Sequence, residues 1–107
     1  MAFYLRRAQQ CQVSITREEA AAIIVCLART FPALARAPLD PWSSSVLDAW
    51  AAQPRLVEQR LAAQFVLSIW NQDQPWRCGR FNPELAHVWN GANGRAFAEW
   101  ARCPWWL

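Results

Sequence analysis

Apolar residues recur at helical spacing after the first 15 positions of the chain. Thr16 and Glu19 fit a capping box, in which each residue satisfies a free backbone N–H at the start of a helix. Apolar side chains then return every three or four residues as far as Phe31. Pro32 has no backbone N–H to continue the ladder, so it ends or kinks this first helix.

A second helix is predicted after Asp40 and Pro41, an N-cap aspartate followed by proline at the first helical position. Pro54 stops it. Its predicted apolar face comprises Trp42, Val46, Leu47 and Trp50.

Residues 54–70 form the longest and most apolar segment. Apolar side chains cover most of its circumference, and only Arg60, Gln64 and Ser68 form a polar stripe. A helix with such a pattern is typical of a central position, where it is packed on several sides. We therefore expect this helix to organise the core.

Two shorter helices are predicted after a polar loop at residues 71–80. Asn82 caps the first of them, and Asn90-Gly91 ends it. Asn93 caps the last helix, which Pro104 ends. Both segments carry apolar residues at helical spacing.

These segments predict a compact all-α bundle of four to five helices around residues 54–70, in a single domain spanning 1–107. Residues 1–15 are an arm or a further helix, because an isolated strand there lacks a partner. Their apolar positions are Phe3, Leu5, Val13 and Ile15. Residues 104–107 form a Trp-rich tail.

The composition excludes a disordered chain, since 54% of the residues are apolar and 18% are charged. The net charge is +3, and arginine supplies all the basic residues without a single lysine. A GC-rich genome explains this bias. The charge by itself therefore does not predict nucleic-acid binding, which usually requires a denser basic stripe.

Cysteine usage and the absence of targeting signals predict a reducing cytoplasm. No two of the four cysteines have C-x-x-C spacing, and the first residues lack the apolar stretch of a secretory leader. No apolar run is long enough to span a membrane. We expect free thiols that are mostly buried and unreactive.

Catalysis and metal binding have little support in the sequence. Cys78, His87 and Asp73 can be written as a nucleophilic triad, but His87 lies on an apolar helix face. Cys78, His87 and Cys103 lack the paired spacing of structural zinc ligands. We expect no enzyme activity, no metal and no cofactor.

A protein partner is the function that the sequence favours. Trp and Arg are enriched at the centres of interfaces, and eight Trp residues are more than a small core readily accommodates. Four of them fall on apolar helix faces and are assigned to the core: Trp50, Trp70, Trp89 and Trp100. The candidate partner-binding residues are Trp42, Trp76, Arg77, Arg80, Trp105 and Trp106. The tail is either a lid on the bundle or a partner contact, and a homodimer remains open.

Nucleic-acid binding is the alternative. Aromatic residues and arginines alternate in the loop 76–81, where aromatic rings can stack on bases and arginines can bind phosphates.

One segment resembles a known family. The sequence Phe65 to Asn71, followed by Cys78-Gly79-Arg80-Phe81-Asn82 and then by Leu85 and Val88-Trp89, is similar to an uncharacterised family of small proteins from integrative and conjugative elements of Gram-negative bacteria. In that family, an apolar helix ends in Trp-Asn, and a Gly-x-Phe-Asp/Asn turn opens the next helix. The resemblance covers about residues 65–89. It implies an accessory, regulatory or anti-defence role on a mobile element.

Overall fold

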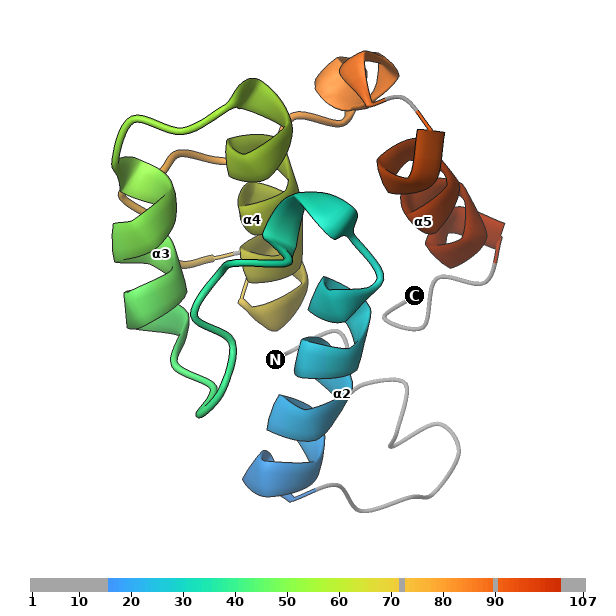
Figure 1. Ribbon diagram of the computed structural model, residues 1–107. Coiled ribbons are helices and arrows are strands. Elements are labelled where there is room, and N and C mark those ends of the chain that lie inside the picture. Colours follow the sequence, from blue (N-terminus) through green and yellow to red (C-terminus); the bar gives the residue numbers. More distant parts are fainter. Residues whose placement is uncertain (1–15, 72, 90, 103–107) are drawn as a thin grey trace.

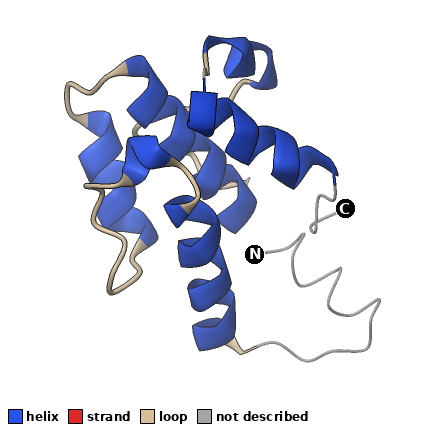
Figure 2. Cartoon of the chain, turned by 45° about the vertical axis from the view of Figure 1, so that its right-hand side comes forward, coloured by secondary structure: helices blue, strands red, loops and turns tan. Residues whose placement is uncertain are grey.

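The computed structural model describes residues 16–71, 73–89 and 91–102, without the side chains of residues 86–88. Four α-helices and two 3₁₀ helices make up this part of the chain, and it contains no strand (Figures 1 and 2). The α-helices are α2 (Arg17–Arg29), α3 (Ser44–Ala52), α4 (Val57–Trp70) and α5 (Gly91–Arg102). The 3₁₀ helices are η1 (Pro32–Leu34) and η2 (Pro83–Val88). The predicted all-α fold is confirmed.

Helix α2 begins after its predicted N-cap, Thr16, with one of the two hydrogen bonds of the predicted capping box. The Thr16 hydroxyl oxygen accepts a hydrogen bond from the Glu19 backbone N–H at 3.1 Å. The helix ends at Arg29, and the chain continues into η1; Phe31, the N-cap of η1, and Leu34 within it are each only 1% exposed. The turn around Pro32 therefore contributes two large core side chains.

Helix α3 starts later than the sequence predicts. The prediction that Asp40 caps it and Pro41 opens it is wrong, because the helix begins at Ser44 and its N-cap is Ser43. The Ser43 hydroxyl accepts a hydrogen bond from the Val46 N–H at 3.4 Å. Asp40 and Pro41 are joined by a cis peptide bond in the preceding loop.

Helix α4 is the centre of the fold, as predicted. It contacts α2, α3, η1 and η2, and eight of its residues are buried. Its start lies at Val57 rather than at Pro54. The Gln59 side chain accepts a hydrogen bond from the Leu56 N–H at 3.0 Å, which sets the first turn.

Aromatic side chains fill the core beside α4. The Phe65 ring is 1% exposed and has ring contacts with residues from η1, α5 and the chain around η2. Its partners are Phe31, Phe81, Trp89, Phe97 and Trp100, with centroid separations between 4.9 and 6.2 Å. Most of these pairs are edge-to-face, the arrangement favoured by the ring quadrupoles.

Beyond α4, the predicted N-cap is present at η2 but not at α5. The Asn82 side chain caps η2 by accepting from the Glu84 N–H at 3.0 Å. Asn93, predicted to cap the last helix, lies inside α5 and is 8% exposed. Its side chain accepts from the Ala33 N–H at 3.0 Å and donates to a Glu58 carboxylate oxygen at 3.4 Å. This tertiary bridge to η1 and α4 replaces the predicted local cap.

The molecule is close to the expected size of a folded chain of this length. Its radius of gyration is 13.2 Å, against about 13 Å for a compact domain. None of the helices within the described ranges is long and apolar enough to cross a membrane. The predictions for residues 1–15 and 104–107 fall outside the described residues.

Candidate functional site

The loop between α4 and η2 is held by a buried carboxylate of α3. Asp48 is 6% exposed. Its two carboxylate oxygens accept hydrogen bonds from consecutive backbone N–H groups, those of Arg77 at 2.9 Å and Cys78 at 2.8 Å. Hydrogen bonds to an ionised acceptor are stronger than those between neutral groups. Asp48 therefore fixes the backbone that carries the candidate arginines.

A second tether comes from the polar stripe of α4. The Gln64 side-chain amide donates to the Cys78 carbonyl at 2.7 Å. The next residue, Gly79, has a φ of +100°, a conformation that favours glycine. A Cβ at this position would lie 3.1 Å from the Gln64 side-chain nitrogen, so glycine also leaves room for the tether.

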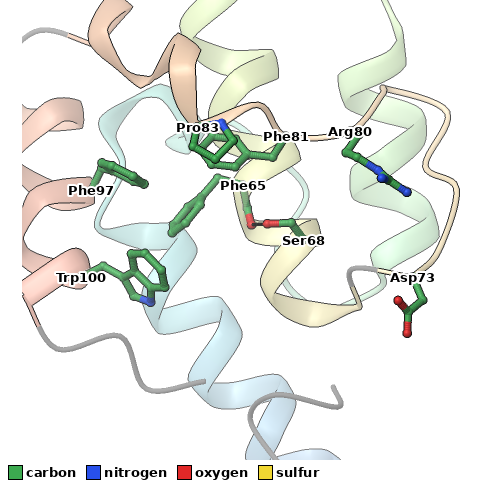
Figure 3. A pocket seen from close by; sticks show the side chains of 8 residues that line it. All are labelled: Phe65, Ser68, Asp73, Arg80, Phe81, Pro83, Phe97 and Trp100. Atoms are coloured by element: carbon green, nitrogen blue, oxygen red, sulfur yellow. Dashed lines mark hydrogen bonds between the residues drawn. The ribbon is translucent and has the colours of Figure 1, made fainter. Parts of the chain in front are cut away.

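A cavity of about 440 Å³ opens between α4, α5 and this loop. Figure 3 shows an aromatic end, a polar side chain of α4 in the middle, and two charged side chains from the loop at the other end. The lining residues are Phe65, Ser68, Asp73, Arg80, Phe81, Pro83, Phe97 and Trp100. We call this space the aromatic cavity. Its volume is within the range of ligand sites.

The two charges of the aromatic cavity are not neutralised by neighbours. Arg80 and Asp73 are exposed. No ion pair joins them to each other or to any other side chain in the described part of the chain. The Ser68 hydroxyl between the two ends donates to the Phe65 carbonyl at 2.6 Å (Figure 3). The cavity therefore combines an apolar end with a solvated, charged rim.

The structure brings some of the predicted partner residues together and places another elsewhere. Trp76, Arg77 and Arg80 share the tethered loop; both arginines are exposed, and the half-buried Trp76 indole donates to the Asn71 carbonyl at 3.1 Å. Trp42 instead packs edge-on against Trp70, with ring centroids 5.2 Å apart.

Trp42 lines a different cavity, of about 400 Å³, between the first turns of α2 and α3. Its indole N–H is buried and has no hydrogen-bond partner among the described residues. The remaining candidates, Trp105 and Trp106, lie outside the described residues.

The tryptophans assigned to the core do pack there. Trp70 and Trp89 are buried at 8% and 5% exposure, and Trp50 and Trp100 are half-buried against the core. The second aromatic residue of the loop, Phe81, belongs to the aromatic cluster and stacks on Trp89 at 5.9 Å. Phe81 therefore anchors the loop.

Cys78 is a poor nucleophile in this fold. Burial raises the pKa of its thiol from 9.0 to about 12, and the hydrogen bond and negative charge of Asp48 act in the same direction. The reactive form of cysteine is the thiolate, which is scarce at neutral pH when the pKa is this high. The expectation of mostly buried thiols is wrong for Cys26, which is exposed on α2.

No metal-binding group is found in the part of the chain that is described, where three or more Cys, His, Asp or Glu side chains do not converge. Of Cys78, His87 and Cys103, which the sequence disfavours as zinc ligands, only the side chain of Cys78 is described. The other two side chains fall outside the described positions.

Of the residues that line the aromatic cavity, the sequence assigned a partner-binding role to Arg80 alone. Phe65 and Phe97 were given no functional role, and Asp48 was not singled out at all. One signal was available for Asp48, because it is the only charged residue of a helix made otherwise of apolar residues and serine. Buried carboxylates in such positions need hydrogen-bond donors.

No protein family, curated protein or solved structure matches this chain.

Proposed function

We propose that this protein is a non-catalytic interaction module that binds a segment of a partner protein in the aromatic cavity. The observation that carries the proposal is the cavity itself, in which rings from three parts of the chain surround about 440 Å³ beside an exposed arginine. Aromatic residues and arginine are the types that dominate binding energy at protein interfaces.

The loop at the rim of the cavity is held by hydrogen bonds, which supports binding of a partner. Binding is tighter when the binding residues are already ordered, because less conformational entropy is lost. The backbone at Arg77 and Cys78 is held by Asp48, and the backbone carbonyl of Cys78 is held by Gln64. Arg80 follows two residues after this double tether.

The loop is less suited to the alternative, nucleic-acid binding. Base stacking requires aromatic faces that project from the surface. The Trp76 indole is half-buried and hydrogen-bonded to Asn71, and Phe81 stacks within the aromatic cluster. The two aromatic residues that favoured nucleic acid in the sequence are thus engaged with the protein.

A displayed peptide library tests the proposal. We expect selected peptides to share one large apolar residue, because the cavity's apolar end has room for it. Replacing Ser68 by Phe places a ring in the cavity and should weaken binding of these peptides by about tenfold or more. The matched control is Ser45→Phe on α3, which lies away from this cavity and should leave binding unchanged. Circular dichroism checks that both variants fold.

Two results would contradict the proposal. One is peptide binding that Ser68→Phe and Ser45→Phe affect equally. The other is the absence of any selected peptide together with tight binding of single-stranded oligonucleotides whose affinity falls steeply with salt, the signature of phosphate contacts.

A second copy of the chain is the rival partner that one observation favours. Leu56 and Val57, at the start of α4, are 72% and 66% exposed. Exposed neighbouring apolar residues are typical of contact surfaces. Sedimentation analysis of wild type and Val57→Glu decides this, since a homodimer through these residues should dissociate in the variant.

The cellular setting that we propose is a reducing cytoplasm, where the protein acts as an accessory or anti-defence factor of a mobile element. The support for the mobile element is the resemblance at residues 65–89. The support for the compartment is the cysteine spacing. A blocking role is consistent with a module that binds without chemistry.

A further inference from the structure

The charged rim of the aromatic cavity has a sign preference that the cavity's shape alone does not reveal. Arg80 lines the cavity, and Arg77 is exposed three residues earlier on the same tethered loop. Among the lining residues that the structure describes, Asp73 is the only acidic one. The loop therefore carries two positive charges and one negative charge, of which Arg80 and Asp73 line the cavity, in a chain of net charge +3.

Neither Arg80 nor Asp73 is paired with the other, although both line the cavity. An unpaired guanidinium offers several N–H donors in a planar fork that matches a carboxylate. Placing a carboxylate against Arg80 requires no existing ion pair to break. Placing a cation there is opposed by Arg80, and complementary charge is what selects partners at interface rims.

We infer that the partner segment is acidic: it inserts one large apolar side chain between Phe65, Phe97 and Trp100 and places a neighbouring carboxylate on Arg80. This inference rests on the proposed function and adds the chemistry of the partner. Asp73 acts against it at the same rim and limits the affinity for acidic segments.

The geometry in Figure 3 fits this arrangement. The aromatic side chains gather at one end, Ser68 lies between, and Arg80 and Asp73 reach the other end from the loop. A segment that crosses the cavity therefore meets the apolar end with one side chain and the charged end with a residue near it in sequence. The loop provides the preference for an acidic residue, and α4 and α5 provide the space for the apolar side chain of the partner segment.

Four short labelled peptides test the inference by fluorescence anisotropy. Three carry a central Phe flanked by Glu, by Lys or by Gln, and the fourth has Glu flanks around a central Gly. We expect the Glu-flanked Phe peptide to bind about tenfold more tightly than the Lys-flanked one at low salt, and the difference to shrink as salt screens the charges. The central Gly should abolish binding.

Charge-changing variants sharpen the test. Arg80→Glu should reverse the preference between Glu and Lys flanks. Asp73→Asn should strengthen binding of the Glu-flanked peptide a few-fold, because it removes a repulsive charge. The matched control is Arg36→Glu, which makes the same change in net charge at an exposed residue lining none of the cavities described, and it should leave the preference unchanged.

The outcomes separate the inference from the proposed function. If the central Phe matters but the flanks do not, the interaction module stands and the acidic partner is wrong. If no peptide binds in an anchor-dependent way, both fall. A chain lacking residues 105–107 gives a further result: much tighter peptide binding would make the protein's own tail the occupant and overturn the inference, whereas unchanged affinity supports it.

Discussion

Helix α3 lies on one side of α4 and α5 on the other, and the two are fixed in different ways (Figure 1). On the α3 side, Leu47 and Ala51 are fully buried. Side chains from the following segment bind the end of α3: Arg60 donates to the Ala51 and Gln53 carbonyls at 3.3 and 3.2 Å, and Arg55 to the Trp50 carbonyl at 2.9 Å. These contacts satisfy carbonyls that a helix end leaves without partners.

On the other side, α5 is held mainly by half-buried aromatic contacts. Its one buried residue is the polar Asn93, and Ala96, Phe97 and Trp100 are only half-buried. Trp100 borders two cavities, the aromatic cavity and a second of about 450 Å³ toward α2. The comparison separates two tasks. The α3 side stabilises the fold and anchors the loop, whereas the α5 side leaves space for a partner.

The largest expected effect is the loss of a core side chain on the α3 side. Leu47→Ala should lower the free energy of unfolding by ~3 kcal/mol, since it leaves a cavity at a residue with 0% exposure. Phe97→Ala should cost less, ~1–2 kcal/mol, because its ring is half-buried beside an existing cavity. Urea denaturation of both variants measures the difference. A larger loss in Phe97→Ala would reverse the comparison.

The tether between α3 and the loop is the next expected contribution. Asp48→Ala leaves the N–H groups of Arg77 and Cys78 without their acceptor and should cost ~2–3 kcal/mol. Hydrogen exchange of these two amides should accelerate. Asp40→Ala, at an exposed aspartate in a loop, is the control and should change stability by less than ~0.5 kcal/mol. Unchanged exchange in Asp48→Ala would show that the tether does not order the loop.

The buried thiol at the tether predicts a pH effect. Its pKa is raised from 9.0 to about 12, so the unfolded thiol ionises before the folded one. The stability gained from the neutral thiol is complete below pH 9 and is lost as the pH rises from 9 towards 12. Wild type should therefore lose more stability than Cys78→Ala over this interval, as measured by denaturation at several pH values.

Alkylation rates distinguish the exposed thiol of α2 from the buried thiol of the loop that α3 anchors. Iodoacetamide at pH 8 should modify the exposed Cys26 on α2 well before the buried Cys78, with the sites assigned by mass spectrometry. Equal rates would mean that the loop opens readily despite Asp48.

The smallest expected effect is at the surface of the α3 side. The Arg55 guanidinium lies 4.3 Å from the centre of the Trp50 ring, a cation–π contact. Arg55→Ala removes this contact together with the hydrogen bond to the Trp50 carbonyl and should cost ~1 kcal/mol, since both lie at a partly exposed site. Arg36→Ala is the matched control with no such ring contact. A loss as large as that of Asp48→Ala would place the main support of α3 at its end instead of its centre.

Local signals predicted the helices well where the chain itself supplies the cap. Thr16 and Asn82 form the predicted hydrogen bonds. Asp40 and Asn93 carry equally good capping chemistry but do not cap helices. Asn93 hydrogen-bonds to Ala33, sixty positions away in the chain. A local sequence pattern cannot predict so distant a partner.

The polar stripe of α4 shows the same limit. Its spacing is evident from the sequence, which predicts no contact for any of the three residues. In the structure, Arg60 binds the end of α3, Gln64 binds the Cys78 carbonyl, and Ser68 lines the aromatic cavity. Each polar residue contacts a different part of the chain. The periodicity therefore predicts which face of the helix is polar, but not which residues that face contacts.

The sequence by itself determined that the chain is helical, that the helix ending at Trp70 is central, and that the loop 76–81 combines aromatic residues with arginines. These are properties of periodicity and composition, which act over a few neighbouring residues. Only the tertiary structure decided that Asp48 holds that loop, and that Phe65, Phe97 and Trp100 leave a cavity beside Arg80. A cavity depends on how side chains from separate helices pack against each other. The spacing of apolar residues within one helix does not determine that packing.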